Sequence, residues 1–253
     1  MLYLFPSDID TLYDFFSGGA DVTVNASAKE KIGIEINTFL TDILHEFQNK
    51  TLEEILDFIE KRIKEFDLSK TNEEGYLKYR DAYNNDSNYH TPLDLFTLSR
   101  YSFHFTMRFS SDLKMNAGFG RGYSNFSTRQ RKNIVPFHAA LQNITIINDD
   151  FRNIKPEITS NNFFYFDPPY LITNNVYNHG ATEANQRWTE VDEKYLLDYI
   201  SKINESGGHF ALSNVITHHG KTNTLLSNWI DKNNFNVHDI VNKGYSHCTH
   251  TTA

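Results

Sequence analysis

The sequence predicts an α/β fold in which a core of strands and helices is divided in two by an inserted region. Three observations support this prediction. Short runs rich in β-branched and aromatic residues alternate with segments of helical periodicity in both outer parts of the chain. A polar, less regular stretch lies between them, from residue 72 to residue 132. The length of 253 residues suits one core domain with a sizeable insert.

The first outer part, residues 1–71, contains two predicted strands. Thr11–Phe16 is an apolar run followed by a glycine pair, and Lys31–Asn37 alternates between apolar and other residues. The span Leu40–Phe66 is expected to be helical, because Thr51–Glu54 forms a capping box and apolar residues then recur on one face.

The insert contains three segments with different patterns. Lys70–His90 is polar and rich in Asn, Asp and Tyr, so we expect a loop or an irregular segment. Pro92–Phe109 is apolar with helical spacing. Lys114–Lys132 is rich in Gly, Ser, Asn and Arg, which indicates an exposed loop or hairpin.

The second outer part, residues 133–253, returns to regular alternation. A glycine pair at Gly207-Gly208 marks the end of one predicted helix. The predicted strands are Asn143–Asn148, Asn162–Phe166, His209–Ser213 and Phe235–Val241, and the predicted helices are Val191–Glu205 and Lys221–Asp231.

Composition favours a globular protein in a reducing compartment. Hydrophobic residues make up 39% of the chain and charged residues 22%, which allows a packed core. The single cysteine, Cys248, excludes a disulfide framework and an all-cysteine metal site. The sequence has no apolar run of about 20 residues and no basic segment before an apolar run at its start. We therefore expect a cytoplasmic protein without a membrane span.

Charge is distributed unevenly along the chain. The net charge of −8, taken alone, argues against a general nucleic-acid binder. However, the region from Arg100 to Lys132 contains seven basic residues and a single acid, Asp112, and so carries +6. A basic island in an acidic protein is typical of a contact with an anionic partner, although a solvated surface loop would have the same composition.

The most informative motif is Asp167-Pro168-Pro169-Tyr170, which directly follows a predicted strand. The two prolines end the strand and fix a stiff turn at its carboxyl end, where open α/β sheets bind ligands. A planar amino group could donate its two N–H bonds to Asp167 and to the Pro168 carbonyl, while Tyr170 could stack on the attached ring. An ordinary turn with a capping aspartate is the alternative interpretation.

Three other strand ends carry candidate binding residues. The first is the segment Asp14, Phe15, Phe16, Ser17, Gly18 and Gly19, where glycine allows close approach of a ligand to the backbone. Glu35, followed by Ile36, ends the second strand, and an acid at that place typically accepts hydrogen bonds from ribose hydroxyls. Asp149, Asp150 and Phe151 end the strand before that of Asp167. Each of these alone would also fit a solvated strand end, a turn or a core residue.

Together the four strand ends resemble the Dam-type N6-adenine DNA methyltransferases, the alpha group of amino-methyltransferases. The resemblance covers about Ile9 to Val241, and the order is that of the group: glycine turn, acid after the second strand, insert, then Asp-Pro-Pro-Tyr. Within the insert, Arg100–Arg108 and Met115–Arg121 stand where the family has its DNA-recognition segments. The resemblance implies a Rossmann-like S-adenosylmethionine-dependent methyltransferase sheet with an inserted, largely helical DNA-recognition region. In this division, residues 1–71 and 133–253 form the methyltransferase core and residues 72–132 the target-recognition insert.

The resemblance also implies a reaction and a set of site residues. A methyl group moves from S-adenosylmethionine, without a metal, to N6 of an adenine that is flipped out of double-stranded DNA. The implied catalytic residues are Asp167, Pro168, Pro169 and Tyr170; the implied cofactor-binding residues are Asp14, Phe15, Phe16, Ser17, Gly18, Gly19, Glu35, Ile36, Asp150, Phe151 and Asp167; the implied DNA-binding residues are Arg100, Arg108, Asn116 and Arg121. Methylation of cytosine C5 would need a nucleophilic cysteine and is disfavoured. A monomer is expected, and a cognate restriction enzyme in the same system would require no direct contact.

The sequence departs from the family pattern in two ways. Ser102, His104, Phe105 and Gly118 replace residues that are usual in the recognition insert, so the recognition sequence stays open. The family's opening segment, with a glycine pair and a lysine, and its last strand are not found, so the chain looks like a fragment or a naturally shortened copy. Two alternatives follow: an inactive remnant that at most binds DNA, or an amino-methyltransferase for an RNA base or a protein glutamine.

Other residues give weaker signals. His218-His219 and the pair His247-Cys248 with His250 are the nearest approach to a metal site, and we expect no metal. Trp188 and Trp229 are predicted only to pack in the core.

Overall fold

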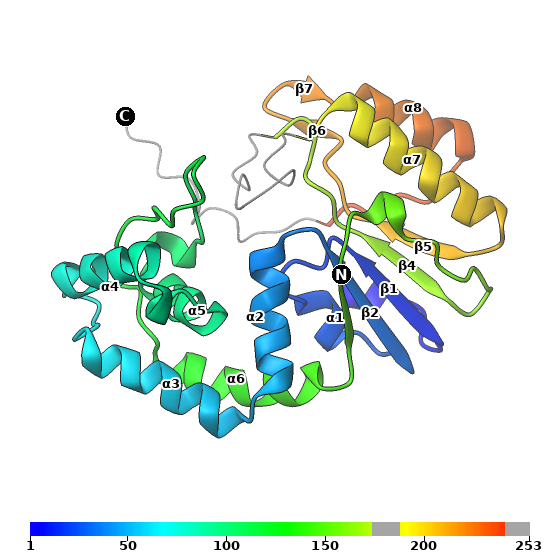
Figure 1. The fold of residues 1–253 in the computed structure, drawn as a ribbon. Helices are drawn as coiled ribbons and strands as arrows, with labels where there is room; N and C mark the ends of the chain where they lie inside the picture. Colours follow the sequence, from blue (N-terminus) through cyan, green and yellow to red (C-terminus); the bar gives the residue numbers. More distant parts are fainter. Residues whose placement is uncertain (174–187, 241–253) are drawn as a thin grey trace.

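The computed structural model describes residues 1–173 and 188–240 and has an α/β core beside a group of helices (Figure 1). The core contains a five-stranded sheet in the order β3-β2-β1-β4-β5, with all neighbouring strands parallel. The strands are β1 (Thr11–Phe15), β2 (Glu30–Glu35), β3 (Thr145–Asn148), β4 (Phe163–Phe166) and β5 (His209–Leu212). The chain thus builds the sheet outward from β1 in one direction and then from β4 in the other, as in doubly wound folds.

Eight α-helices and one small hairpin complete the part of the chain that the structure describes. The helices are α1 (Asp21–Asn25), α2 (Thr38–Asn49), α3 (Leu52–Glu65), α4 (Glu73–Asn85), α5 (Pro92–Tyr101), α6 (Thr128–Leu141), α7 (Glu190–Glu205) and α8 (Thr224–Asn233). The hairpin consists of β6 (Thr217–His218) and β7 (Lys221–Thr222). Among the described residues, no helix combines the length and the apolar character that a bilayer crossing requires.

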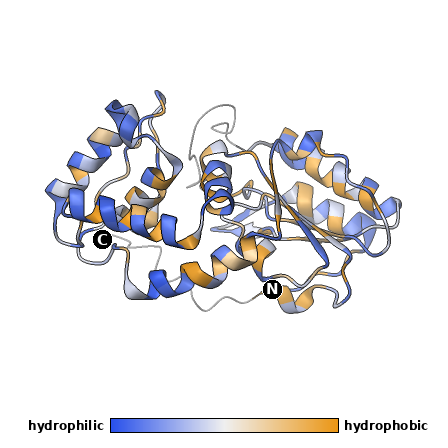
Figure 2. Cartoon of the chain, turned by 60° about the horizontal axis from the view of Figure 1, so that its bottom comes forward, coloured by the Kyte–Doolittle hydropathy of each residue, from blue (hydrophilic) through white to orange (hydrophobic). Residues whose placement is uncertain are grey.

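Both faces of the sheet are covered. Alternate residues of β4 point to opposite faces, so Phe164 and Phe166 pack with α7, whereas Phe163 and Tyr165 pack with the segment that precedes β1. The helices carry hydrophobic and hydrophilic residues on different sides (Figure 2). The inner strand β4, Phe163–Phe166, is accordingly apolar and buried at every position, as expected for a parallel strand between two layers.

Helices α3, α4 and α5 form a separate helical group on the left of Figure 1. A buried ion pair ties α3 to α5: Arg62 Nε lies 2.8 Å from Asp94 Oδ1, and Tyr79 of α4 donates to the same oxygen at 2.7 Å. Because α3 packs against α5, the helical group includes residues before position 72. The division into segments 1–71, 72–132 and 133–253 stays a prediction.

The prediction of a loop over Lys70–His90 is wrong, because this segment contains α4. The helix begins where the Asn72 side chain accepts from Gly75 N at 3.1 Å. Its buried face is formed by Tyr76, Tyr79 and Tyr83, which lie on one side of the helix. The Tyr76 hydroxyl donates to the Ala117 carbonyl at 2.8 Å. Tyr76 and Tyr79, whose hydroxyl groups form hydrogen bonds, therefore occupy core positions where aliphatic residues are more usual.

Four other predicted boundaries differ from the structure. The helical span Leu40–Phe66 is two helices, since the capping box at Thr51 starts α3 anew. The segment Lys114–Lys132 ends in the first turn of α6, and the helix predicted from Lys221 begins at Thr224. Residues 102–109 leave α5 for a short turn in which His104 and Phe105 have φ of 52° and 57°.

The predicted strand Phe235–Val241 is wrong over its described part, residues 235–240, which form no strand. Phe235 instead packs its ring against Phe210 and Trp229, with centroids 5.1 and 4.6 Å apart. The remainder of this prediction, Val241, lies outside the described residues.

Candidate active site

Four of the predicted site segments meet at one edge of the sheet. Phe15 at the end of β1 is aligned with Ile34 of β2 and with Phe166 of β4, and Glu35 is aligned with Asn148 of β3. Because parallel strands end on the same side, the segments that follow them lie next to one another. The strand ends that the sequence analysis singled out therefore form one site.

The loop after β1 is held close to β2. Ser17 N donates to the Ile34 carbonyl at 2.9 Å. A Cβ atom on Gly33 would lie 3.1 Å from Ser17 Oγ, so the missing side chain makes room for the loop. Phe16 and Gly18 have positive φ, 65° and 53°. Ser17 Oγ is buried and has no hydrogen-bond partner among the described residues, which leaves it available to a bound group.

Glu35 joins the ends of β1 and β2. Its Oε2 accepts from Gly18 N and its Oε1 from Asn37 N, both at 2.8 Å. Burial raises the pKa of Glu35, and these backbone N–H groups oppose that rise. Each oxygen keeps a lone pair, so the carboxylate can accept further hydrogen bonds from a ligand. Ile36, the next residue, is 36% exposed.

Asp14 lies within β1, below the strand end, and is 1% exposed. Thr23 of α1 donates to Asp14 Oδ2 at 2.5 Å. The pKa of Asp14 is raised to about 7, mainly by burial and in smaller part by repulsion from the nearby carboxylates of Asp167 and Glu35. Three acids with raised pKa values thus share this edge of the sheet, and a cation bound among them would relieve their repulsion.

The turn after β4 presents Asp167 and Tyr170. Asp167 is exposed at the sheet edge, yet desolvation by the surrounding protein raises its pKa. The Tyr170 hydroxyl donates to Asp167 Oδ1 at 2.9 Å, which favours the charged form of the carboxylate. Pro168 is buried, whereas Pro169 and Tyr170 are half-buried. One carboxylate and one aromatic ring therefore stand together at the mouth of the site.

Two of the predicted residues have side chains in the core. Phe15 is fully buried and stacks on Phe166 with ring centroids 4.7 Å apart, so only its backbone faces the loop. Phe151 is 5% exposed and packs against Phe16 at 5.0 Å. Asp150 accepts from Arg152 N at 2.9 Å and caps the short helical turn after β3.

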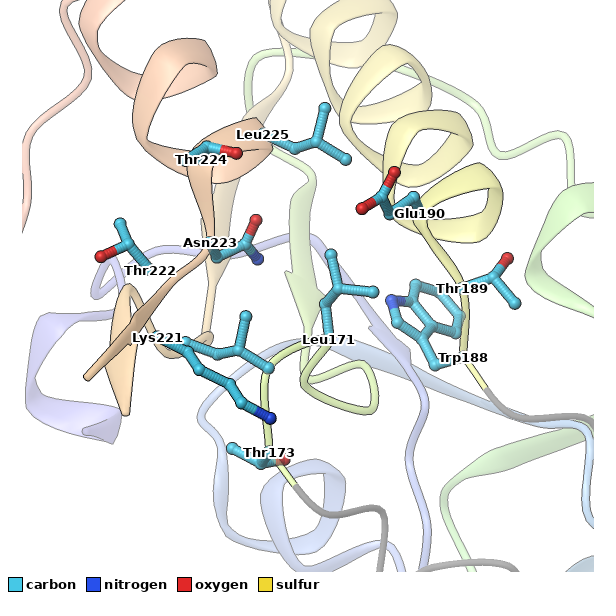
Figure 3. Close-up of a pocket in the computed structure, with 11 residues that line it drawn as sticks. Leu171, Thr173, Trp188, Thr189, Glu190, Lys221, Thr222, Asn223, Thr224 and Leu225 are labelled. Carbon is cyan, nitrogen blue, oxygen red and sulfur yellow. The ribbon is translucent and has the colours of Figure 1, made fainter. Parts of the chain in front are cut away.

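A pocket of about 420 Å³ lies beside the Asp167 turn (Figure 3). Trp188 and Asn223 stand on facing sides of this pocket, with Leu171 between them. Lys221 and Thr173 complete the near side. The ring of Trp188 also contacts Phe16 in an edge-to-face arrangement, with centroids 5.7 Å apart. Trp188 was predicted only to pack in the core, because it stands at no characteristic sequence distance from the strand-end motifs.

The predicted DNA-binding residues lie on the helical group and its loops. Arg100 of α5 lies against the rings of Phe96 and Phe105, 4.9 and 5.5 Å from their centroids, and donates to Ser99 Oγ. Burial lowers its pKa to about 10, so it stays charged at neutral pH. Within residues 1–173 and 188–240, Arg100 forms no ion pair. In the part of the chain that the structure describes, no acidic side chain therefore compensates its charge.

The other three predicted residues have local partners. Arg108 Nε donates to Asn116 Oδ1 at 2.8 Å and its guanidinium also reaches the Asn116 carbonyl, so these two residues form one unit. Arg121 forms an exposed ion pair with Glu73 of α4. The loop of residues 102–119 closes through antiparallel bridges and exposes Phe103, which is 52% exposed.

In the part of the chain that the structure describes, no group of three or more His, Cys, Asp or Glu side chains is arranged to hold a metal ion. His218 and His219 lie next to each other at the exposed turn between β6 and β7. His247, Cys248 and His250 lie outside the described residues. The expectation of a metal-free site stays a prediction.

Comparison with known proteins identifies the family. The family profile for D12 class N6 adenine-specific DNA methyltransferases matches residues 1–243. The chain is 39% identical over 255 residues to the modification methylase StsI of Streptococcus sanguinis, covering 100% of this chain and 38% of that protein. It is 39% identical over 253 residues to the type II methyltransferase M.FokI of Planomicrobium okeanokoites, covering 99% and 38%.

A third relative is more distant. The chain is 32% identical over 247 residues to the modification methylase LlaI of Lactococcus lactis subsp. lactis, covering 95% of this chain and 38% of that methylase. The chain thus spans well under half the length of these relatives. The profile match extends over both the sheet and the helical group. The chain belongs to the D12 class of N6 adenine-specific DNA methyltransferases.

Proposed function

We propose that this chain carries the catalytic centre of a site-specific DNA methyltransferase that moves a methyl group from S-adenosylmethionine to N6 of adenine in double-stranded DNA. One observation carries the proposal: the Asp167 turn stands at the same sheet edge as the Gly18 loop and Glu35. A site for a planar amine and a site for a nucleoside cofactor are therefore adjacent. Family membership supports the reaction type.

The residues at the sheet edge suit this cofactor. S-adenosylmethionine supplies a methyl group on a positively charged sulfonium. Glu35 has free lone pairs for the ribose hydroxyls, and Ser17 Oγ is buried without a partner among the described residues. The raised pKa values of Asp14 and Asp167 indicate an acidic site that favours a cation. Phe16 and Phe151 provide apolar rings beside it.

The Asp167 turn orients the acceptor. Asp167 and the Pro168 carbonyl accept the two N–H bonds of the adenine amino group, which directs the nitrogen lone pair toward the cofactor side. To do so, Asp167 Oδ1 exchanges the Tyr170 hydroxyl for an amino hydrogen, and the Tyr170 ring stacks on the base. Most of the rate comes from this positioning, because the leaving group needs no further activation.

The helical group supplies the contacts with DNA. Arg100 carries a charge without an acidic partner among the described residues, and the Arg108–Asn116 unit offers both N–H donors and an amide. Exposed rings such as Phe103 offer faces on which bases can stack. A basic insert that carries Arg and Asn between the two halves of the core favours DNA over an RNA base or a protein glutamine.

Methyl transfer tests the proposal. The chain is incubated with S-adenosylmethionine and either DNA that lacks methylated adenine or RNA, and the digested nucleosides are assayed by mass. We expect N6-methyladenine from DNA alone, and a loss of at least about 1000-fold in Asp167→Ala. Methylation of RNA alone, or equal activity of the two proteins, would reject the proposal.

A further inference from the structure

Glu193 of α7 is a buried acid for which the proposed reaction has no use. The residue is fully buried, and its carboxylate receives hydrogen bonds from three uncharged side chains. Trp188 Nε1 donates to Oε2 at 2.7 Å. Asn223 and Asn214 donate to Oε1 at 2.8 and 3.1 Å. Burial of a carboxyl group is costly, so a site with three aimed donors is a specific arrangement.

The two asparagines are fixed in orientation by the backbone. Asn223 Oδ1 accepts from Leu226 N at 3.1 Å and thereby caps α8. Asn214 Oδ1 accepts from Val215 N at 2.7 Å. Each amide must then turn its NH₂ group toward Glu193. Residue 193 must therefore present one acceptor oxygen to the two asparagines and another to the Trp188 indole N–H. A glutamine has one acceptor oxygen, so it could accept from the asparagines or from Trp188 but not from all three.

Trp188 connects this cluster to the cofactor side of the site. Its indole ring contacts Phe16 and Phe151, with centroids 5.7 and 6.1 Å away. Phe16 belongs to the loop after β1, and Phe151 belongs to the turn after β3. The indole ring of Trp188 also lines the pocket beside the Asp167 turn (Figure 3). The hydrogen bond from the indole N–H to Glu193 thus fixes the position of the Trp188 ring.

We propose that Glu193 is a positioning residue for the cofactor: it holds Trp188, through the indole N–H, in the place where its ring supports Phe16 and Phe151. This inference rests on the proposed binding of S-adenosylmethionine at the sheet edge. Glu193 itself does not touch the cofactor. Its loss weakens cofactor binding because an unanchored Trp188 no longer fixes these two rings.

Glu193→Gln tests the proposal with the smallest change of shape. The glutamine amide must direct its NH₂ group either toward the two asparagines or toward Trp188. Because the asparagines are more firmly fixed, we expect the NH₂ group to face Trp188, whose indole N–H then loses its acceptor. We expect the Kd for S-adenosylmethionine, measured by calorimetry without DNA, to rise about tenfold, as for the loss of one buried hydrogen bond. The Kd for DNA is expected to stay within about twofold, since the hydrogen-bond partners that the structure describes for the Glu193 side chain lie outside the helical group.

The matched control is Ser201→Ala. Trp229 Nε1 donates to Ser201 Oγ at 2.9 Å, so this variant removes an acceptor from the other tryptophan, whose ring packs against Phe210 and Phe235. Cofactor affinity should not change in this control. In a Trp229→Phe background, Trp188 is the one remaining indole of the chain, and its fluorescence reports directly on the Glu193→Gln change.

A double-mutant cycle separates positioning from a general loss of stability. Trp188→Phe removes the N–H and keeps a ring, so the effect of Glu193→Gln should largely disappear in the Trp188→Phe background. Full additivity of the two changes would overturn the proposal. If Glu193→Gln does not fold, Trp188→Phe alone should still weaken cofactor binding several-fold, and unchanged affinity would overturn the proposal equally.

The outcomes also distinguish this inference from the proposed function. The positioning role alone is overturned if the parent chain binds S-adenosylmethionine and the Glu193→Gln variant binds it with equal affinity and shows unchanged Trp188 emission. A folded parent chain that does not bind the cofactor overturns the proposed function, and the positioning role with it.

Discussion

The sheet edge and the helical group differ in how they treat charge. At the sheet edge, Asp14, Glu35 and Asp167 all have raised pKa values, and the largest cause in each case is desolvation. In the helical group and its loops, several cations already pair with acids, as Arg121 does with Glu73 and Arg62 with Asp94. Within residues 1–173 and 188–240, none of these three carboxylates forms an ion pair, and Arg100 is a cation that also forms none.

This difference fits two ligands of opposite charge on one chain. A sulfonium compound is favoured at the acidic edge, and the phosphates of DNA are favoured at the helical group. The net charge of −8 hides the division, because it averages both regions. Substitutions at the acidic edge and in the helical group should therefore have different effects.

The largest expected effect is on the stability of the helical group. Asp94 is fully buried and accepts from Arg62, Tyr79 and Thr91, so Asp94→Ala leaves Arg62 buried without its main partner. We expect the free energy of unfolding to fall by about 3–5 kcal/mol in a urea titration. The exposed pair Lys78–Glu74 is the control, and Glu74→Ala should leave the urea midpoint unchanged.

The next effect concerns the cofactor. Glu35→Ala removes the acceptors for Gly18 N and Asn37 N and for the ribose, so we expect the Kd for S-adenosylmethionine to rise about 100-fold. Asp150→Ala is the comparison, since Arg152 already holds that carboxylate, and its effect should be clearly smaller. A larger effect at Asp150 than at Glu35 would contradict the assignment of the ribose site.

A smaller effect is expected for DNA. Arg100→Met keeps the apolar stem against Phe96 and Phe105 but removes the charge. DNA affinity at moderate salt should fall about tenfold, and the slope of log Kd against log salt should decrease by about one. Arg121→Met should have less effect, because Glu73 already neutralises Arg121. Fluorescence anisotropy with a labelled duplex measures both.

A further expected effect is a dependence of stability on pH. The pKa of Asp14 is raised to about 7 in the folded protein, so between about pH 4 and pH 7 the folded state binds more protons than the unfolded state. This contribution to stability is present at low pH and is lost as the pH rises through about 7. Asp14→Asn should remove it, and melting temperatures of the two proteins from pH 5 to pH 8 would show a smaller decline in the variant.

Local signals in the sequence predicted the sheet and its edge. Strand patterns followed by a glycine turn, by Glu35, by Asp149 or by Asp167 located four strand ends, and the structure brings them together because parallel strands share one edge. The last predicted strand failed because Phe235 finds its partners, Phe210 and Trp229, without joining the sheet. An apolar run alone does not reveal whether its contacts are made by side chains or by a strand ladder.

Other features depended on contacts between distant parts of the chain. Helix α4 was missed because its core residues are tyrosines whose hydroxyl groups find partners as far away as Ala117. The cluster of Trp188, Glu193 and Asn223 joins an acid to two donors that no sequence spacing connects. The site residues themselves stay predictions from the strand ends.

The central claim is that the acidic sheet edge performs the chemistry and the helical group binds DNA. Single-turnover methyl transfer tests it most directly, with DNA titrated against the parent chain, Asp167→Asn and Arg100→Met. We expect Asp167→Asn to bind DNA with parental affinity but to transfer no methyl group at any DNA concentration. We expect Arg100→Met to regain the parental rate when DNA is saturating. Parental transfer by Asp167→Asn, or a rate in Arg100→Met that saturating DNA does not restore, would contradict the account.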